Sequence, residues 1–128
     1  MIVLDEQMQD PRIFAAIERW YPGQVISITQ ARRSTRILDD VVPALLHGLK
    51  EPTFVTANYK DFWLKIEAHP GYCVICIELP VERLREASSI LRNLLKSAEW
   101  KTKRKRMGKV ISISGKTIRY YQVKSRNE

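Results

Sequence analysis

Six oxygen-bearing side chains stand just after predicted strands or at the start of a predicted helix: Asp5, Glu6, Asp39, Asp40, Asn58 and Asp61. Carboxylate and amide oxygens, with no His or Cys set beside them, suit a hard cation such as Mg²⁺ or Mn²⁺. One or two such ions can activate water and offset the charge on a phosphodiester oxygen as it is attacked. The residue types therefore predict metal-assisted hydrolysis of a phosphodiester.

The same acidic residues also have ordinary structural explanations. Asp39 and Asp40 are well placed to cap the helix that follows them, and Asp61 could cap a helix that contains Phe62. Glu6 could be a plain surface charge. The spacing of the acids leaves both the metal site and these structural roles open.

Strand and helix patterns alternate over residues 1–97. Short apolar runs, which are typical of buried strands, lie at 2–4, 25–28, 53–56 and 72–79. Apolar residues recur at helical spacing at 11–20, 40–49, 60–68 and 81–100. This alternation predicts an α/β fold with a mainly parallel sheet and right-handed crossovers.

In a parallel α/β sheet, ligands bind beyond the carboxyl ends of the strands. Asp5 follows the first predicted strand, the loop Thr29–Arg36 follows the second, and Asn58 and Asp61 follow the third. The helix opened by Asp39 or Asp40 should start at the same edge. The candidate ligands are therefore predicted to meet at one edge of the sheet.

The C-terminal part of the chain has a different pattern. Val110–Ser114 and Thr117–Val123 alternate apolar and polar residues around Gly115-Lys116, which predicts a β-hairpin. The 128 residues are expected to form a single domain, with an α/β core at 1–100, a basic connector at 101–109 and the hairpin at 110–123.

The net charge of +8 is concentrated near the C-terminus, since residues 96–128 hold 11 Lys/Arg and only 2 Asp/Glu. Such a segment favours a polyanion, nucleic acid first. A solvated tail that only increases solubility is the alternative. The side chains predicted to contact RNA phosphates are Arg32, Arg33, Arg36, Lys101, Lys103, Arg104, Lys105 and Arg106.

The sequence predicts neither a membrane span nor a thiol site for metal or redox chemistry. The longest apolar runs are far shorter than the roughly 20 residues of a membrane span, and no leader pattern precedes Asp5, so a cytoplasmic protein is predicted. Cys73 and Cys76 lie three apart in a predicted strand and therefore face opposite sides of the sheet. They are predicted to be buried structural thiols that cannot share a metal ion.

The chain resembles the small stand-alone PIN-like proteins, relatives of the PIN-domain ribonuclease toxins of bacterial toxin–antitoxin pairs. The motifs that carry the resemblance are I-V-L-D-E-Q (2–7), D-D-V-V-P-A-L-L (39–46), F-V-T-A-N-Y-K-D-F (54–62), Y-C-V-I-C-I (72–77) and V-I-S-I-S-G-K-T-I-R-Y-Y-Q-V (110–123). The resemblance covers nearly the whole chain and implies a PIN-like three-layer sandwich.

The resemblance also implies roles for individual residues. Asp5, Asp40 and Asp61 correspond to the catalytic acids that hold Mg²⁺ or Mn²⁺, with Asp40 preferred to Asp39 by its distance to Thr56. Glu6, Asp39 and the Thr56 hydroxyl would support them. Asn58 departs from the family, whose members often carry an aspartate there; it can still bind a metal through its carbonyl oxygen but adds no charge.

The function implied is a metal-dependent endoribonuclease acting on single-stranded RNA, as the toxin of a toxin–antitoxin pair. The expected partners are RNA, a small acidic antitoxin and further copies of the chain. The alternative is a PIN-like module with weak or no turnover that binds nucleic acid or an antitoxin through its basic C-terminal region.

Overall fold

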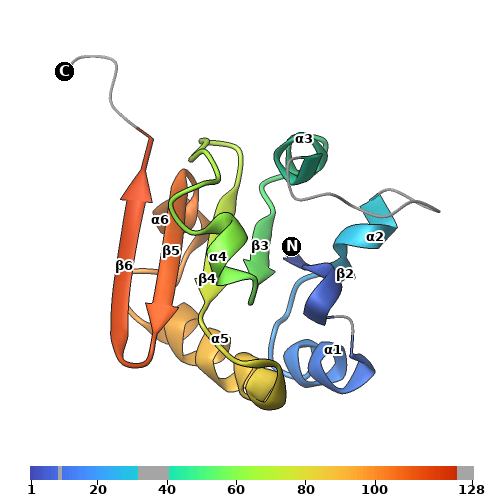
Figure 1. Ribbon diagram of the computed structural model, residues 1–128. Helices are drawn as coiled ribbons and strands as arrows, with labels where there is room; N and C mark the ends of the chain where they lie inside the picture. The colour runs from blue at the N-terminus through green and yellow to red at the C-terminus, as the bar shows by residue number, and fades with distance from the viewer. Residues whose placement is uncertain (9, 32–40, 124–128) are drawn as a thin grey trace.

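The computed structural model describes residues 1–8, 10–31 and 41–123, which form a six-stranded sheet with helices on both faces (Figure 1). The strands are β1 (Ile2–Leu4), β2 (Val25–Ser27), β3 (Thr53–Thr56), β4 (Cys73–Ile77), β5 (Lys109–Ser114) and β6 (Thr117–Gln122). Their order across the sheet is β2-β1-β3-β4-β5-β6. Neighbouring strands pair in parallel except β5 and β6, which form the predicted hairpin.

The α/β class and the layered arrangement predicted from the sequence are confirmed. The helical segments are η1 (Glu6–Met8), α1 (Pro11–Glu18), α2 (Ile28–Ala31), α3 (Val42–His47), α4 (Tyr59–Phe62), η3 (Val81–Glu86), α5 (Ala87–Lys96) and α6 (Lys103–Arg106). Helices α1 and α5 pack on each other and cover one face of the sheet (Figure 1). Helices α3 and α4 cover the other face, so the described residues form three layers.

Each parallel strand is buried on both faces because helices cover the sheet on both sides. Along β4, Cys73, Ile75 and Ile77 pack in the core with α1 and α5, whereas Val74 and Cys76 pack in the core with α3 and α4. The two cysteines therefore face opposite sides of the sheet, as predicted. Burial raises the pKa of each thiol to about 12, so both are protonated at neutral pH.

The start of α1 also agrees with the sequence prediction. Asp10 accepts a hydrogen bond from the backbone N–H of Arg12 at 2.8 Å, and Pro11 occupies the first turn. Ile13 and Ile17 are buried against the sheet. This helix carries the chain from the end of β1 back to the start of β2.

Two predicted helices have different bounds in the structure. The helix expected at 60–68 ends at Phe62, because the backbone of Trp63 is extended and Leu64 then adopts a left-handed φ of 63°. The helix expected at 81–100 begins as a 3₁₀ segment and becomes α-helical only at Ala87. At the start of the 3₁₀ segment Val81 is 79% exposed, whereas Leu84 is partly buried.

The C-terminal third of the fold contains a short helix that the sequence did not predict. Thr102 caps α6 by accepting a hydrogen bond from the Lys105 N–H, so part of the predicted connector is helical. Gly115 turns the hairpin with a φ of +59°.

In the part of the chain that the structure describes, no helix is long and apolar enough to cross a membrane.

Candidate functional site

The carboxyl ends of β1 and β3 bring two predicted site residues into contact. Asp5 follows β1, and its backbone N–H donates to the carbonyl of Val55 at 3.0 Å. Thr56 is the last residue of β3, and its hydroxyl donates to Asp5 Oδ2 at 2.6 Å. Because β1 and β3 pair in parallel, with Leu4 opposite Val55, this contact between residues 51 positions apart follows from the strand register.

The hydrogen bonds continue from Thr56 along the chain to Asp61. The Thr56 hydroxyl accepts from the backbone N–H of Asn58 at 2.9 Å, and Asn58 Nδ2 donates to Asp61 Oδ2 at 2.7 Å. Asn58 precedes α4, which carries Asp61 in its first turn. Asp5, Thr56, Asn58 and Asp61 thus form one connected group, which we call the acidic cluster.

Asp5 is the buried member of the acidic cluster, with 5% of its surface exposed. Burial raises the pKa of the Asp5 carboxyl, and the negative charges of Glu6 and Asp61 raise it further. Hydrogen bonds from the Thr56 hydroxyl and the Glu6 N–H, the latter at 2.8 Å, act in the opposite direction. The pKa of the Asp5 carboxyl is raised overall, so a nearby cation would stabilise its charged form.

The oxygen donors of the acidic cluster are of the chemical types that bind a hard divalent cation. Asp5 and Asp61 supply carboxylates, and the amide of Asn58 supplies a carbonyl oxygen. Each carboxylate oxygen of Asp5 accepts one hydrogen bond and retains a lone pair. Among the described residues, no group of three or more His, Cys, Asp or Glu side chains is close enough to share an ion.

Several predicted site residues lie outside the described residues. These are the second acid, Asp40, its alternative Asp39, and the arginines of the loop after β2, namely Arg32, Arg33 and Arg36. Glu6 is described: it lies in η1 next to Asp5 and is partly buried. The acidic cluster therefore contains two of the three predicted catalytic acids, together with the predicted Asn58 and Thr56.

A cation that the sequence analysis missed contacts Tyr59, the residue that follows Asn58 of the acidic cluster. Arg119 of β6 donates from Nη2 to the hydroxyl of Tyr59 at 3.0 Å, and its guanidinium lies 5.4 Å from the centre of the Trp63 ring. The Tyr59 hydroxyl in turn bonds the Ser112 hydroxyl at 2.9 Å. The signal in the sequence is the hairpin register, which pairs Arg119 with Ser112 and so fixes its face.

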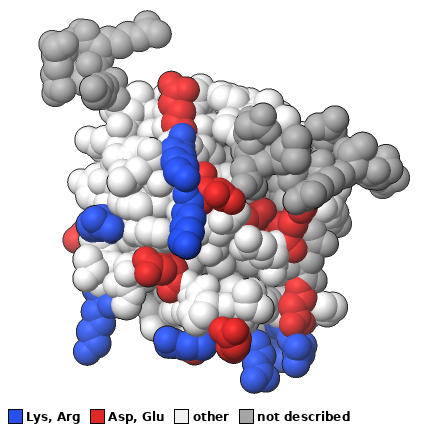
Figure 2. Space-filling view, in the orientation of Figure 1, with Lys and Arg blue, Asp and Glu red and all other residues white. Residues whose placement is uncertain are grey.

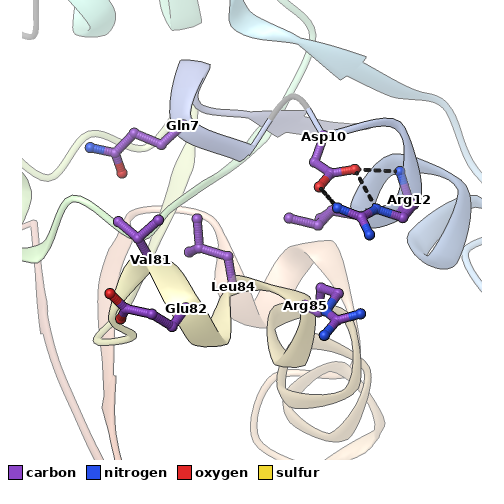
Figure 3. A pocket seen from close by; sticks show the side chains of 8 residues that line it. Gln7, Asp10, Arg12, Val81, Glu82, Leu84 and Arg85 are labelled. Atoms are coloured by element: carbon purple, nitrogen blue, oxygen red, sulfur yellow. Dashed lines mark hydrogen bonds and ion pairs between the residues drawn. The ribbon is translucent and has the colours of Figure 1, made fainter.

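A hollow of about 350 Å³ lies where η1 and the start of α1 approach η3 (Figure 3). Gln7 and Glu82 line one part of it. The ion pair between Asp10 and Arg12, 3.0 Å long, lines another part, and Arg85 lies nearby (Figure 3). Because acidic and basic groups both line this hollow, it does not select a ligand of one sign.

The basic connector and the acidic cluster lie at opposite ends of the parallel strands. Helix α6 leads into β5, which runs parallel to β4, so the connector is at the amino ends of the parallel strands. Lys109 and Ser114, at the two ends of β5, are roughly 16 Å apart at about 3.3 Å per residue. A phosphate bound at the connector therefore does not also contact Asp5.

The individual side chains of the connector differ in exposure. Lys101, Lys103, Arg104 and Lys105 are exposed, as expected for RNA contacts, but Arg106 is only 4% exposed. Arg106 therefore lies inside the fold, unlike the other four. On the face that carries α4, basic and acidic side chains are mixed and do not form a continuous basic surface (Figure 2). Trp100, the tryptophan beside the connector, is buried against Tyr120.

Comparison with known proteins does not extend this description. No protein-family model matches the chain, and no curated protein or solved structure matches it significantly. What the site can do is therefore inferred from its own residues: a buried carboxylate, a hydroxyl, an amide and an exposed carboxylate joined by hydrogen bonds at the carboxyl edge of a parallel sheet.

Proposed function

We propose that this protein is a PIN-like, metal-dependent endoribonuclease that hydrolyses single-stranded RNA at the acidic cluster, as the toxin of a toxin–antitoxin pair. The observation that carries the proposal is the 2.6 Å hydrogen bond from Thr56 to the buried Asp5 carboxylate, with Asn58 and Asp61 joined to it. These groups lie where ligands bind in parallel α/β sheets.

In the proposed site, Asp5, Asp61 and the Asn58 carbonyl would hold Mg²⁺ or Mn²⁺, with Asp40 or Asp39 as a further carboxylate ligand. The bound ion would activate water and stabilise negative charge on the phosphodiester. The Thr56 hydroxyl holds one oxygen of Asp5 and the Glu6 N–H holds the other, so the carboxylate is fixed in orientation. Fixed ligands need little reorganisation when the ion binds.

RNA would approach this edge with help from cations that are separate from the connector. Arg119 lies beside Tyr59, which follows Asn58 directly, and its charge could contact a phosphate of the substrate. We also propose Arg32, Arg33 and Arg36, as predicted from the sequence, as phosphate contacts. Such contacts supply affinity and salt dependence with little sequence specificity.

The proposal is tested by incubating single-stranded RNA with the protein in Mg²⁺ or Mn²⁺. Cleavage is expected with either ion and should stop in excess chelator, because in the proposed mechanism the ion activates the water and stabilises the charge on the phosphodiester. Returning Mn²⁺ after chelation should restore cleavage. RNA that is cleaved equally well in chelator would rule out a metal-dependent mechanism.

Asn58→Asp is expected to strengthen metal binding about tenfold, since it adds a carboxylate to the ligand set. In saturating Mg²⁺ the variant should gain about 1.4 kcal/mol more stability than the parent gains, or roughly 5 °C in Tm. In chelator it should be less stable than the parent, because a second carboxylate replaces the amide that donates to Asp61. Thermal unfolding with and without Mg²⁺ measures both effects.

The matched control is Asn93→Asp, which makes the same change at an exposed position of α5. It should respond to Mg²⁺ as the parent does. If both variants gain equally from Mg²⁺, the ion binds elsewhere and Asn58 is not a ligand.

The second candidate function is binding without turnover, either of nucleic acid or of a small acidic partner protein. It is favoured by Asn58 in place of an acid and by the exposed cations Lys103, Arg104 and Lys105 at the edge away from the acidic cluster. It predicts salt-sensitive RNA binding that chelator does not change. Charge reversal of those three residues should abolish that binding.

A further inference from the structure

A second pocket, of about 450 Å³, lies between the end of α1, the end of α5 and the basic connector. Trp20 and Tyr21 form its aromatic wall. The cationic side chains that line it are Arg92, Lys96, Lys101, Lys103 and Arg106. The amino group of Met1, which precedes β1, donates to the Tyr21 hydroxyl at 3.1 Å, so this pocket is at the amino ends of the strands. It is thus separate from the acidic cluster.

The positive charge of this pocket is not balanced by acidic groups in the described part of the chain. None of the described residues that line it is acidic. The ion pairs among described residues join Arg12 to Asp10 and Arg83 to Glu86, all outside the pocket. Burial lowers the pKa of the Met1 amino group and repulsion from Lys103 and Arg106 lowers it further, while the negative charge of Glu51, which does not line the pocket, acts in the opposite direction. The pocket therefore attracts anions.

Arg106 is the buried cation of this pocket, with 4% of its surface exposed. Its Nη1 donates to the carbonyls of Trp100 and Lys101 at 2.9 and 3.2 Å, while its Nε has no acceptor within the described residues. A buried guanidinium is usually paired with a carboxylate or a phosphate, because an unpaired buried charge is costly. An anion in the pocket would supply the missing negative charge.

The aromatic wall suggests what the anion is attached to. Trp20 Nε1 donates to the Ser88 hydroxyl at 3.0 Å, which fixes the indole ring, and the Tyr21 ring meets it edge-on at 6.1 Å. Aromatic rings beside cations are a common way to bind a nucleotide, since the base stacks and the phosphate is neutralised. The pocket volume is also within the range of about 300–1,000 Å³ of small-molecule sites.

We propose that this pocket binds a nucleotide, with its phosphate on Lys96, Lys103 and Arg106 and its base against Trp20 or Tyr21. The ligand is either a free mononucleotide or the phosphorylated end of an RNA strand. The site does not depend on ribonuclease activity, because it shares no residue with the acidic cluster.

The test is calorimetric titration of the intact protein with AMP, adenosine and inorganic phosphate. AMP should bind at least about tenfold more tightly than adenosine, the effect of losing a charge-assisted hydrogen bond. It should also bind more tightly than phosphate, which cannot contact the rings. Equal affinity of AMP and adenosine, or of AMP and phosphate, would overturn the nucleotide assignment.

The variant that tests the residues is the double substitution Lys96→Glu and Lys103→Glu, at two exposed positions whose replacement leaves the core intact. It should bind AMP at least about tenfold more weakly. The control is Lys60→Glu with Lys116→Glu, which makes the same charge change at exposed positions outside the pocket. An equal loss in the control would show that only net charge matters and would overturn the proposal.

Two further measurements separate the alternatives. A 5′-phosphorylated trinucleotide that binds more tightly than AMP identifies the ligand as an RNA end, whereas weaker binding identifies a free nucleotide. Asp5→Asn should bind AMP as the parent does. This result would support the nucleotide site whether or not the acidic cluster is active. The two proposals can therefore fail independently.

Discussion

Asp5→Asn is expected to lower the rate of metal-dependent RNA cleavage by at least about 100-fold. Changes to groups that only support a metal ligand already cost about 10- to 100-fold, and Asp5 is proposed as a ligand itself. The amide keeps the shape of the side chain and can still accept the Glu6 N–H, but it removes the charge that holds the ion. Cleavage of single-stranded RNA in Mn²⁺ measures the effect.

The stability of this variant shows whether the loss is one of chemistry or of folding. Because burial raises the pKa of the Asp5 carboxyl, ionised Asp5 is strained in the folded state at neutral pH, and the neutral amide removes that strain. The amide nitrogen cannot accept the hydrogen bond from the Thr56 hydroxyl, which offsets this gain, so in chelator the variant should stay folded with a stability close to that of the parent. A variant that is inactive and also unfolded would not support the catalytic role.

Two companion variants define the site. Asp61→Asn should also lose cleavage, whereas Glu78→Gln should not, although Glu78 is an exposed carboxylate that follows β4 at the same edge. Full activity in both Asp5→Asn and Asp61→Asn would show that the acidic cluster is not the catalytic site.

Thr56→Val is expected to destabilise the protein by about 1.5–3 kcal/mol, the range for a hydrogen bond to a charged group. This corresponds to roughly 5–10 °C in Tm for a chain of this size. The reason is that Thr56 is fully buried and its hydroxyl is the donor that holds the buried Asp5. Valine has nearly the same volume, so packing changes little. The loss of the hydrogen bond to Asp5 dominates, and the loss of the one that the hydroxyl accepts from the Asn58 N–H adds to it. Thermal or urea unfolding measures the change.

Thr53→Val is the matched control because Thr53 is buried in the same strand. No side-chain hydrogen bond of Thr53 is present among the described residues. Its replacement should change stability by no more than about 0.5 kcal/mol. If both valine variants lose the same stability, the cost comes from the strand itself and the Asp5–Thr56 bond contributes little.

The sequence by itself determined the fold class and most strands and helices. It also determined that Asp5, Asn58 and Asp61 follow the carboxyl ends of parallel strands. Continuous apolar runs such as Ile2–Leu4 and Cys73–Ile77 are typical of strands that are covered on both faces of a parallel sheet, so the α/β class followed from pattern alone. The alternation of side chains along a strand likewise placed Cys73 and Cys76 on opposite faces. Both conclusions rest on local geometry, which does not depend on distant residues.

Only the tertiary structure decided which polar groups meet. That Thr56 donates to Asp5 depends on β1 lying next to β3, and that Arg119 joins Tyr59 depends on the hairpin register. Local pattern also gave the wrong bounds for the helices at 60–68 and 81–100, because the chain is extended at Trp63 and left-handed at Leu64, and Val81–Glu86 forms a 3₁₀ segment.

The location of the positive charge was likewise decided by strand order. The sequence showed a basic segment, but the parallel direction of β5 places that segment at the amino ends of the strands, away from Asp5. At that end, Lys101, Lys103 and Arg106 of the segment line a pocket together with Trp20 and Tyr21, and Arg106 is buried. Charge can be counted from a sequence, whereas the groups that a charge faces depend on which strands pair and in which direction.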